Sequence, residues 1–261
     1  MDFVEIDLKE TKGEWSMSDL QSHDYYELYF LLEGTRRLFL GERIANVTAP
    51  ALCVIPPFCM HKTEGGAYRR INVNVSPRVL TECEEQKLER LSASYIFKLM
   101  PRSGELILPL LESAIYTRPT PDNCGLTNAY LHVLLHLLDG ECLSPLEIAA
   151  SVPEKRVNAT VTRVIEYVNK YYNEDFSIEM LCHKFFISKN TLCKEFRTLM
   201  SCSVIEYRTF VRISRAKELL ASTEKSMEAI AEECGFSSAN YFCLIFKKNV
   251  GIAPSYYRKA K

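Results

Sequence analysis

Two groups of residues near the C-terminus combine side chains that can read double-stranded DNA. Asparagine can bind adenine through two hydrogen bonds, and lysine or arginine can bind guanine or neutralise phosphates. Cysteine is short and weakly polar, and reaches at most a thymine methyl group. The residues are Lys189, Asn190, Cys193, Lys194 and Arg197 in the first group, and Ala239, Asn240, Cys243, Lys247 and Lys248 in the second. Their types and helical spacing predict two helix faces suited to the major groove.

The two groups belong to an internal repeat in the last hundred residues. The first copy begins at Ser177 and the second at Ser226, 49 residues later, and the ends of the copies are 50 residues apart. Each copy has the order of a helix, a tight turn and a second helix. We therefore expect two helix-turn-helix units, at about 177–197 and 226–247.

Local signals place the helices of both units. Gly235 marks the turn of the second copy, because glycine tolerates a left-handed backbone. Serines at helix starts can cap the unpaired amides. These are Ser177 and Ser188 in the first copy, and Ser226 with Ser237 or Ser238 in the second. The buried sides of the second helices carry i,i+4 pairs, Leu192 with Phe196 and Phe242 with Phe246.

A further helix, at residues 205–220, joins the two units. It carries Arg208, Arg212, Arg215 and Lys217. As a stiff joint it would hold the units about 34 Å apart, one turn of DNA. The alternative is that the outward faces are only the solvated sides of core helices, and the duplication argues against it.

Charge is divided unevenly along the chain. Residues 1–155 contain 15 Lys and Arg against 22 Asp and Glu, and residues 156–261 contain 17 against 11. The net charges of −7 and +6 favour a polyanionic partner for the C-terminal part, although ordinary solvated surface would give the same balance.

Length and composition are those of a globular chain, with 261 residues of which 47% are hydrophobic and 25% charged. The longest apolar run, 131–138, contains His132 and His136, and a membrane span needs about 18 or more apolar residues. The first ten residues lack the features of a secretory signal. We therefore expect a cytoplasmic protein that does not enter a membrane. The ten cysteines lack paired metal-type spacing and are expected to be reduced.

The N-terminal half changes from β-rich to helical near residue 80. Apolar runs at 25–32, 37–40, 51–55 and 71–75 predict strands, and Gly34, Gly41, Pro56-Pro57 and Gly65-Gly66 are interpreted as turns. We expect a small antiparallel sheet closed into a barrel or sandwich. The fold class is therefore α+β, with domains at 1–140 and 157–261 and a linker at 141–156.

The segment 126–138 predicts an amphipathic helix. One apolar face contains Leu126, Ala129, Tyr130, Val133, Leu134, Leu137 and Leu138. Leu131 and Leu135 add a second strip, which we assign to a partner helix in a homodimer; alternatively, the chain covers both strips itself. His132 and His136 have the spacing of a helical metal pair but no third ligand nearby in the sequence, so we interpret them as surface or interface histidines.

Residues 157–259 resemble the AraC/XylS family of bacterial transcription regulators. The resemblance rests on Ile230-Ala231-Glu232-Glu233-Cys234-Gly235-Phe236-Ser237, Tyr241-Phe242, Phe246-Lys247-Lys248, Gly251, Pro254-Ser255 and Tyr257-Arg258, and on Glu206-Tyr207, Arg212, Ala216-Lys217 and Leu219-Leu220 in the joining helix. It implies two units that read successive major-groove faces. Cys182 and Ser201 depart from the family pattern conservatively. Leu244 stands where the family often has a basic residue, so the first unit is expected to supply more of the base discrimination.

Residues 15–80 resemble the cupin-like sensing domain of AraC-type regulators, through the string from His23 to Gly34, Ile55-Pro56-Pro57 and His61. In metal-using cupin enzymes a His-x-His, a Glu and a later His bind one ion. Here Gln21 replaces the first histidine and leaves three ligands, which can still hold a metal. The interpretation we favour is a small-effector site at His23, Tyr25, Glu27, Tyr29, Arg36 (or Arg37) and His61. The alternatives are a barrel that binds a protein partner or only scaffolds dimerisation, and a metal-dependent enzyme.

The sequence thus predicts a cupin-like β-barrel with a helical dimerisation segment, followed by an all-α domain with two helix-turn-helix units. The expected function is a sequence-specific transcription activator that binds promoter DNA, contacts RNA polymerase and responds to a small effector through linkage between its domains. A repair enzyme with a reactive cysteine is disfavoured, because no cysteine has an activating sequence context. No catalytic residue, metal or cofactor is assigned.

Overall fold

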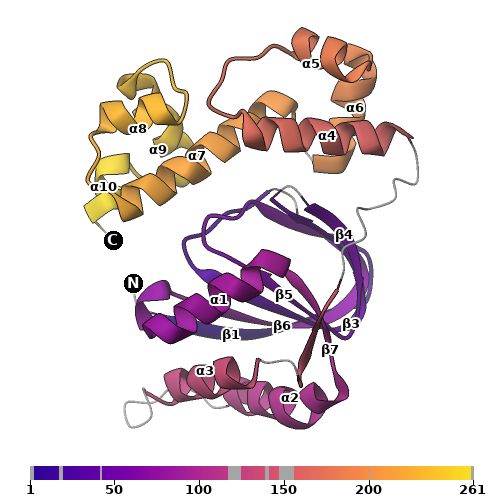
Figure 1. The fold of residues 1–261 in the computed structure, drawn as a ribbon. Helices are drawn as coiled ribbons and strands as arrows, with labels where there is room; N and C mark the ends of the chain where they lie inside the picture. The colour runs from indigo at the N-terminus through magenta and orange to yellow at the C-terminus, as the bar shows by residue number, and fades with distance from the viewer. Residues whose placement is uncertain are drawn as a thin grey trace.

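A computed structural model describes residues 3–17, 20–41, 43–116, 125–138, 141–146, 156–200 and 202–259. In these residues the N-terminal part forms a curved antiparallel sheet with the helices α1, α2 and α3, and the C-terminal part forms helices (Figure 1). This arrangement agrees with the expected α+β class. None of the helices within these residues is long and apolar enough to cross a membrane.

Within the described residues the sheet has eight strands, with the order β1-β6-β3-β5-β7-β8, while β2 pairs with β6 and β4 pairs with β3. The strands are β1 (Val4–Thr11), β2 (Trp15–Ser16), β3 (Tyr26–Leu40), β4 (Arg43–Thr48), β5 (Ala51–Ile55), β6 (His61–Val75), β7 (Ile96–Leu99) and β8 (Leu143–Pro145). The long antiparallel pair of β3 and β6 forms the centre of the sheet.

Two of the glycine positions interpreted as turns lie inside strands, so that part of the sequence interpretation is wrong. Gly34 continues β3 through irregularities in the register, and Gly65-Gly66 continue β6. A Cβ atom on Gly34 would lie 2.2 Å from the carbonyl oxygen of Ala67. Glycine is therefore needed here because the two strands approach each other closely, which the sequence pattern does not distinguish from a turn.

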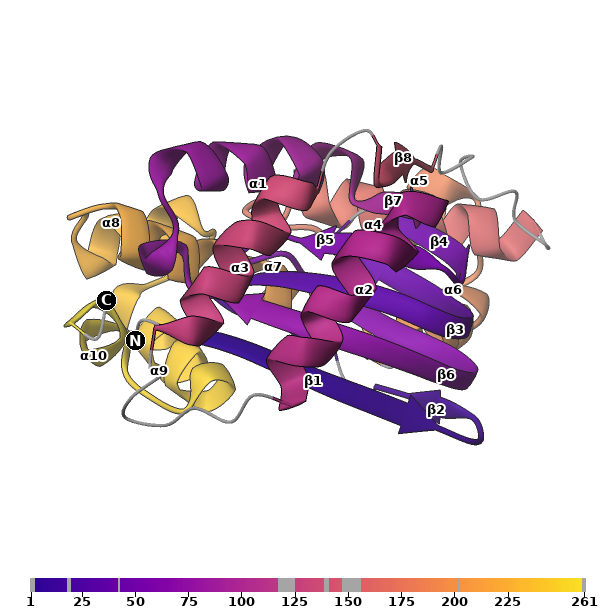
Figure 2. The same ribbon diagram turned by 90° about the horizontal axis from the view of Figure 1, so that it is seen from below.

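One face of the sheet is covered by α2 (Pro101–Tyr116) and α3 (Leu126–Leu137) (Figure 2), and α1 (Glu82–Ser94) follows the short 3-10 helix Pro77–Val79. Leu28, Phe30 and Val73 of the sheet share a buried core with Leu131 and Leu135 of α3. The strip assigned to a partner is thus buried within the chain together with Leu134 and Leu138 of the expected core face, as in the alternative interpretation. Val133, on the face expected to be buried, is 49% exposed.

The described residues of the C-terminal part form the helices α4 (Arg156–Lys170), α5 (Ile178–Phe185), α6 (Lys189–Met200), α7 (Val204–Ser222), α8 (Met227–Glu233), α9 (Ala239–Val250) and α10 (Pro254–Lys259). They surround two separate cores. The first half of α7 packs with α4, α5 and α6, through Tyr207 and Val211. Its second half packs with α8 and α9, through Ile213 and Ala216. Helix α7 therefore belongs to both cores.

The helical part is in contact with the sheet. Phe39 of β3 and Ile44 of β4 belong to the same buried cluster as the first core. Lys217 Nζ of α7 donates a hydrogen bond to the carbonyl oxygen of Ser22 at 3.2 Å, and the Ser214 hydroxyl donates to the carbonyl oxygen of Phe58. Movement of the sheet relative to α7 would therefore break specific polar contacts.

The expected linker at 141–156 is only partly described. Residues 143–145 form β8, which pairs with β7, and Arg156 begins α4. Residues 147–155 lie outside the described residues, as does Ser201.

Candidate nucleic-acid interface and N-terminal pocket

The first helix pair, α5 and α6, is held by two serine caps. Ser177 Oγ accepts a hydrogen bond from the backbone N–H of Met180 at 3.1 Å, and Ser188 Oγ accepts one from Thr191 at 3.2 Å. Both caps were expected from the sequence. Between the helices, Phe186 has a left-handed backbone with φ 53°. This conformation could not be predicted from the residue type, because phenylalanine rarely adopts it.

The second pair, α8 and α9, repeats this arrangement. Ser226 Oγ accepts from the N–H of Ala229 and Ser238 Oγ accepts from that of Tyr241, both at 3.2 Å. Of the two serines left open by the sequence, Ser238 is therefore the cap. Gly235 at the turn has φ 77°, as expected.

The outward faces of α6 and α9 carry most of the residues expected to contact DNA. Leu192, Phe196, Phe242 and Phe246 are fully buried, which directs the opposite sides of both helices outward. The exposed residues are Lys189, Asn190, Cys193, Lys194 and Arg197 on α6, and Asn240, Lys247 and Lys248 on α9, while Ala239 and Cys243 are half-buried. Lys189 Nζ lies 2.8 Å from Glu179 Oε1. On α9, Leu244 is 65% exposed, so this face is less polar than that of α6.

Two arginines of the joining helix have a structural role. Arg212 is buried, and its guanidinium donates to the carbonyl oxygens of Tyr172 at 2.6 Å and Glu174 at 3.2 Å. Arg208 donates to that of Phe176 at 3.4 Å. These bonds fix the segment between α4 and α5 to α7, and so stabilise the position of the first helix pair.

A polar pocket of about 330 Å³ lies on the sheet face opposite α2 and α3. Strand alternation places its side chains: Glu27 and Tyr29 of β3 lie opposite Asn74 and Asn72 of β6. Five of the six residues proposed for an effector line this pocket, namely His23, Tyr25, Glu27, Tyr29 and His61.

Arg36 lies outside the lining of this pocket. It is fully buried, and its guanidinium donates to the carbonyl oxygens of Trp15 and Gly66. Other residues that line the pocket, including Arg70, Asn72 and Asn74, were not predicted from the sequence. The alternation of Ile71-Asn72-Val73-Asn74-Val75 shows that Asn72 and Asn74 share one face of the strand. It does not show whether this face lines a pocket or is open to solvent.

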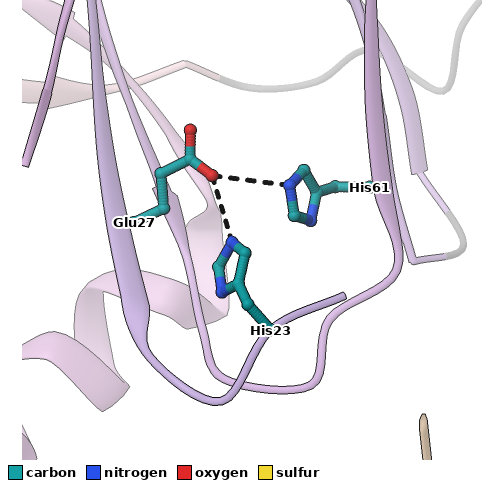
Figure 3. A group of neighbouring side chains, drawn as sticks. All are labelled: His23, Glu27 and His61. Carbon is teal, nitrogen blue, oxygen red and sulfur yellow. Dashed lines mark hydrogen bonds and ion pairs between the residues drawn. The ribbon is translucent and has the colours of Figure 1, made fainter. Parts of the chain in front are cut away.

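Within the pocket, His23 and His61 both face the carboxylate of Glu27 (Figure 3). The Nε2 atoms lie 3.1 Å and 3.4 Å from the same oxygen, Glu27 Oε2. Burial alone would raise the pKa of Glu27, but hydrogen bonds with His23 and His61 outweigh it and hold the pKa well below its ordinary range. Burial lowers the pKa of His23, whereas Glu27 outweighs burial at His61 and raises that pKa. A negative carboxylate is therefore held between two imidazole rings.

The two helical histidines of α3 lie at the surface, and one of them pairs with a carboxylate of α1. His132 Nδ1 lies 2.6 Å from Glu84 Oε1 of α1, and both His132 and His136 are exposed. They are surface histidines, as expected.

Comparison with known proteins finds the family model described as "Helix-turn-helix domain" over residues 181–260, which contains α6 to α9. A regulator named YijO from Escherichia coli K12 is 26% identical over 180 residues; the match covers 69% of this chain and 61% of that protein. The chain thus covers less than two thirds of this relative's length. The transcriptional activator RhaR of E. coli O139:H28 is 26% identical over 246 residues, with 91% and 86% covered.

The chain belongs to the AraC family of transcriptional regulators. This confirms the family inferred from the second helix pair. A solved structure, the C-terminal domain of AraT from Geobacillus stearothermophilus, is 30% identical, with 41% of this chain and 89% of that one covered and a TM-score of 0.39. The relatives of this AraC-family chain are regulators, which agrees with the expectation that it is not an enzyme.

Proposed function

We propose that this AraC-family chain is a sequence-specific transcription activator that binds promoter DNA as a homodimer in the cytoplasm and contacts RNA polymerase. The supporting observation is the pair of exposed polar faces on α6 and α9, whose two cores share α7. A shared helix keeps two reading helices at a fixed separation, as binding to successive major grooves requires. RhaR, a relative over 91% of the chain, is an activator, which favours activation here.

The two helix-turn-helix units contribute unequally in this proposal. The α6 face presents Asn190, Lys194 and Arg197, whereas Leu244 gives the α9 face an exposed apolar side chain. The first unit therefore supplies more of the base discrimination, and the second mainly grips the backbone through Lys247 and Lys248.

The N-terminal part is proposed to be a cupin-like domain that binds a small polar effector. Its pocket of about 330 Å³ is of a size that holds a small ligand. Among the described residues, the hydroxyl of Tyr29 and the Oδ1 atoms of Asn72 and Asn74 are buried without a hydrogen-bond partner. Unpaired buried polar atoms are costly, so they favour a ligand rich in hydrogen-bonding groups.

Effector and DNA binding are coupled in this proposal through the contacts between sheet and α7. An effector that favours one arrangement of Phe58 and Ser22 against Ser214 and Lys217 shifts the population of the DNA-competent form. The exposed side of α3, with Val133, is the proposed dimer surface.

The test begins with selection of binding sites from a random duplex library by the full chain. Asn190→Ala and Lys194→Ala should then weaken binding to the selected site by about 1–3 kcal/mol and relax specificity at one position. Lys98→Ala, which removes an exposed lysine from β7, is the matched control and should leave affinity unchanged. Selection of no sequence would contradict the proposal. If the variants lose affinity equally for selected and random DNA, Asn190 and Lys194 contact only the phosphates.

A further inference from the structure

A second pocket, of about 890 Å³, lies between the N-terminal part and the helical part. On one side it is lined by α1 and the start of β3, and on the other by α7 and α10, which lies toward the same end of the molecule as α1 (Figures 1 and 2). Among the described residues, it shares no lining residue with the polar pocket of the sheet. We call it the acidic pocket, and it is a separate candidate site.

Carboxylates outnumber basic groups in the acidic pocket. Its lining contains one basic side chain, Arg78, and the acidic residues Asp24, Glu85, Glu89 and Glu218. Glu218 is paired with Arg215 at 2.9 Å. Glu85 and Glu89, one turn apart on α1, have no ion pair with any described residue. These two carboxylates therefore give the pocket a negative charge that the chain does not compensate.

Aromatic side chains line the same space, namely those of Phe3, Tyr26, Phe58 and Tyr257. Burial raises the pKa of Tyr26, and Glu85 and Glu89 raise it further. Burial likewise raises the pKa of Tyr257, with a further contribution from Asp24. Both phenols therefore stay protonated with carboxylates nearby. Aromatic rings offer apolar surface and attract cations to their faces, so they favour the same charge as the carboxylates do.

A buried hydroxyl in the wall of the pocket lacks a partner. Ser92 is 8% exposed, and its Oγ is among the described buried atoms without a hydrogen bond. It lies three residues after Glu89, on the face of α1 that also carries Glu85. A serine hydroxyl can accept a hydrogen bond from an ammonium group, and leaving it unpaired is costly. The hydroxyl therefore favours a ligand with N–H groups at this wall.

We propose that the acidic pocket binds an organic cation, a protonated amine joined to an aromatic or other apolar body. Glu85 and Glu89 bind the ammonium group, Ser92 Oγ accepts one of its N–H bonds, and the aromatic side chains surround the apolar body. The volume of about 890 Å³ is within the range of small-molecule sites. The inference goes beyond the proposed function, because neither the DNA-reading faces nor the polar pocket contains these residues.

The position of the pocket gives such a ligand contacts with both parts of the chain. The ammonium group lies against α1, whereas Glu218 of α7 and Tyr257 of α10 line the opposite side. A bound cation therefore stabilises the observed arrangement of α1 against the C-terminal helices. The competing explanation is that Glu85 and Glu89 are ordinary solvated groups of α1. It predicts weak attraction of any cation, with no preference for an apolar body.

Dansylcadaverine is the probe, because it joins a fluorescent aromatic group to a primary ammonium through an alkyl chain. The full chain should bind one equivalent saturably, with a rise in dansyl fluorescence. Its neutral N-acetyl derivative and dansyl-aminohexanoate, which has a carboxylate instead of the ammonium, should bind about tenfold more weakly or less. Spermidine, a cation without an apolar body, should displace the probe poorly.

Variants place the binding in the acidic pocket. Glu85→Gln combined with Glu89→Gln should weaken binding of dansylcadaverine about tenfold or more, and Ser92→Ala about threefold. The matched control is Glu82→Gln combined with Glu105→Gln, which removes the same charge from exposed positions outside the pocket and should bind as the parent does. Thermal melts show that each variant is folded.

The inference is overturned by absence of saturable binding, by equal binding of the ammonium and carboxylate probes, or by unchanged affinity after the Glu85 and Glu89 substitutions. Displacement by spermidine as effective as that by unlabelled dansyl-free phenylalkylamines would show an acidic surface only. The assay contains no DNA. A chain that selects a DNA sequence but binds no cation therefore refutes this inference alone, and one that binds the cation but selects no DNA refutes the proposed function alone.

Discussion

Phe186 and Gly235 occupy the same position in the two helix pairs, 49 residues apart, and both have a left-handed backbone. The φ angles are 53° and 77°. Phe186 is 96% exposed, so its side chain contributes almost no packing that would offset the strain. The second copy has glycine at this left-handed position, whereas the first copy has phenylalanine, for which a left-handed backbone is unfavourable.

Phe186→Gly should therefore stabilise the chain by about 1 kcal/mol, because it removes the cost of a Cβ atom in the left-handed region. The reverse holds at the equivalent position. A Cβ on Gly235 would lie 2.3 Å from the carbonyl oxygen of Asn173, so Gly235→Ala should cost about 2 kcal/mol or more. Urea denaturation measures both, and destabilisation by Phe186→Gly would contradict the assignment of strain.

Arg212 should matter for stability. Arg212→Met leaves the carbonyl oxygens of Tyr172 and Glu174 without their charged donor, and should cost about 2–3 kcal/mol. The control on the same helix is Arg215→Met, which breaks an exposed pair with Glu218 and should cost about 0.5 kcal/mol or less. If Arg212→Met and Arg215→Met lower the free energy of unfolding equally in chemical denaturation, the buried hydrogen bonds of Arg212 contribute no extra stability.

Cysteine alkylation should report DNA contact at α6. Cys193, exposed on α6, and Cys83, exposed on α1, should react readily. Burial raises the pKa of Cys53 well above normal and that of Cys234 to about 12, so both should react slowly. The selected DNA should slow alkylation of Cys193 at least tenfold and leave Cys83 unchanged, as followed by peptide mass spectrometry. Protection of neither residue would place the DNA away from α6.

Leu244→Lys should strengthen DNA binding, because it adds a positive charge to the exposed face of α9. One new phosphate contact should steepen the dependence of log affinity on log salt by about 0.9. Titrations at several salt concentrations give that slope. An unchanged slope would mean that α9 does not approach the DNA backbone at this residue. Lys98→Ala is the control, because it changes the net charge at a position on the sheet.

The helix pairs could be predicted from the sequence because their signals are local. Serine caps and the pair Leu192 and Phe196 act within a few residues, and each reappears in the structure. The sheet depends on contacts distant in sequence. Whether Gly34 ends a strand is decided by Ala67 on another strand, and the burial of Leu131 is decided by the sheet that α3 covers. Local patterns do not contain that information.

Five of the six residues proposed for an effector line the pocket, and they were proposed from the resemblance to a cupin-like domain, because alternation alone does not show which side chains point inward. Arg36 lies elsewhere, because its guanidinium is enclosed by the backbone carbonyls of Trp15 and Gly66. The convergence of His23 and His61 on one oxygen atom depends on a loop and a strand start that the sequence does not bring together.

The segment that follows β5 contacts both the helical part and the pocket of the sheet. Within it, the carbonyl of Phe58 meets Ser214 of α7, and three residues later His61 faces Glu27 in the pocket. The residue that contacts α7 and the residue that faces the pocket carboxylate are therefore neighbours on one short stretch of chain.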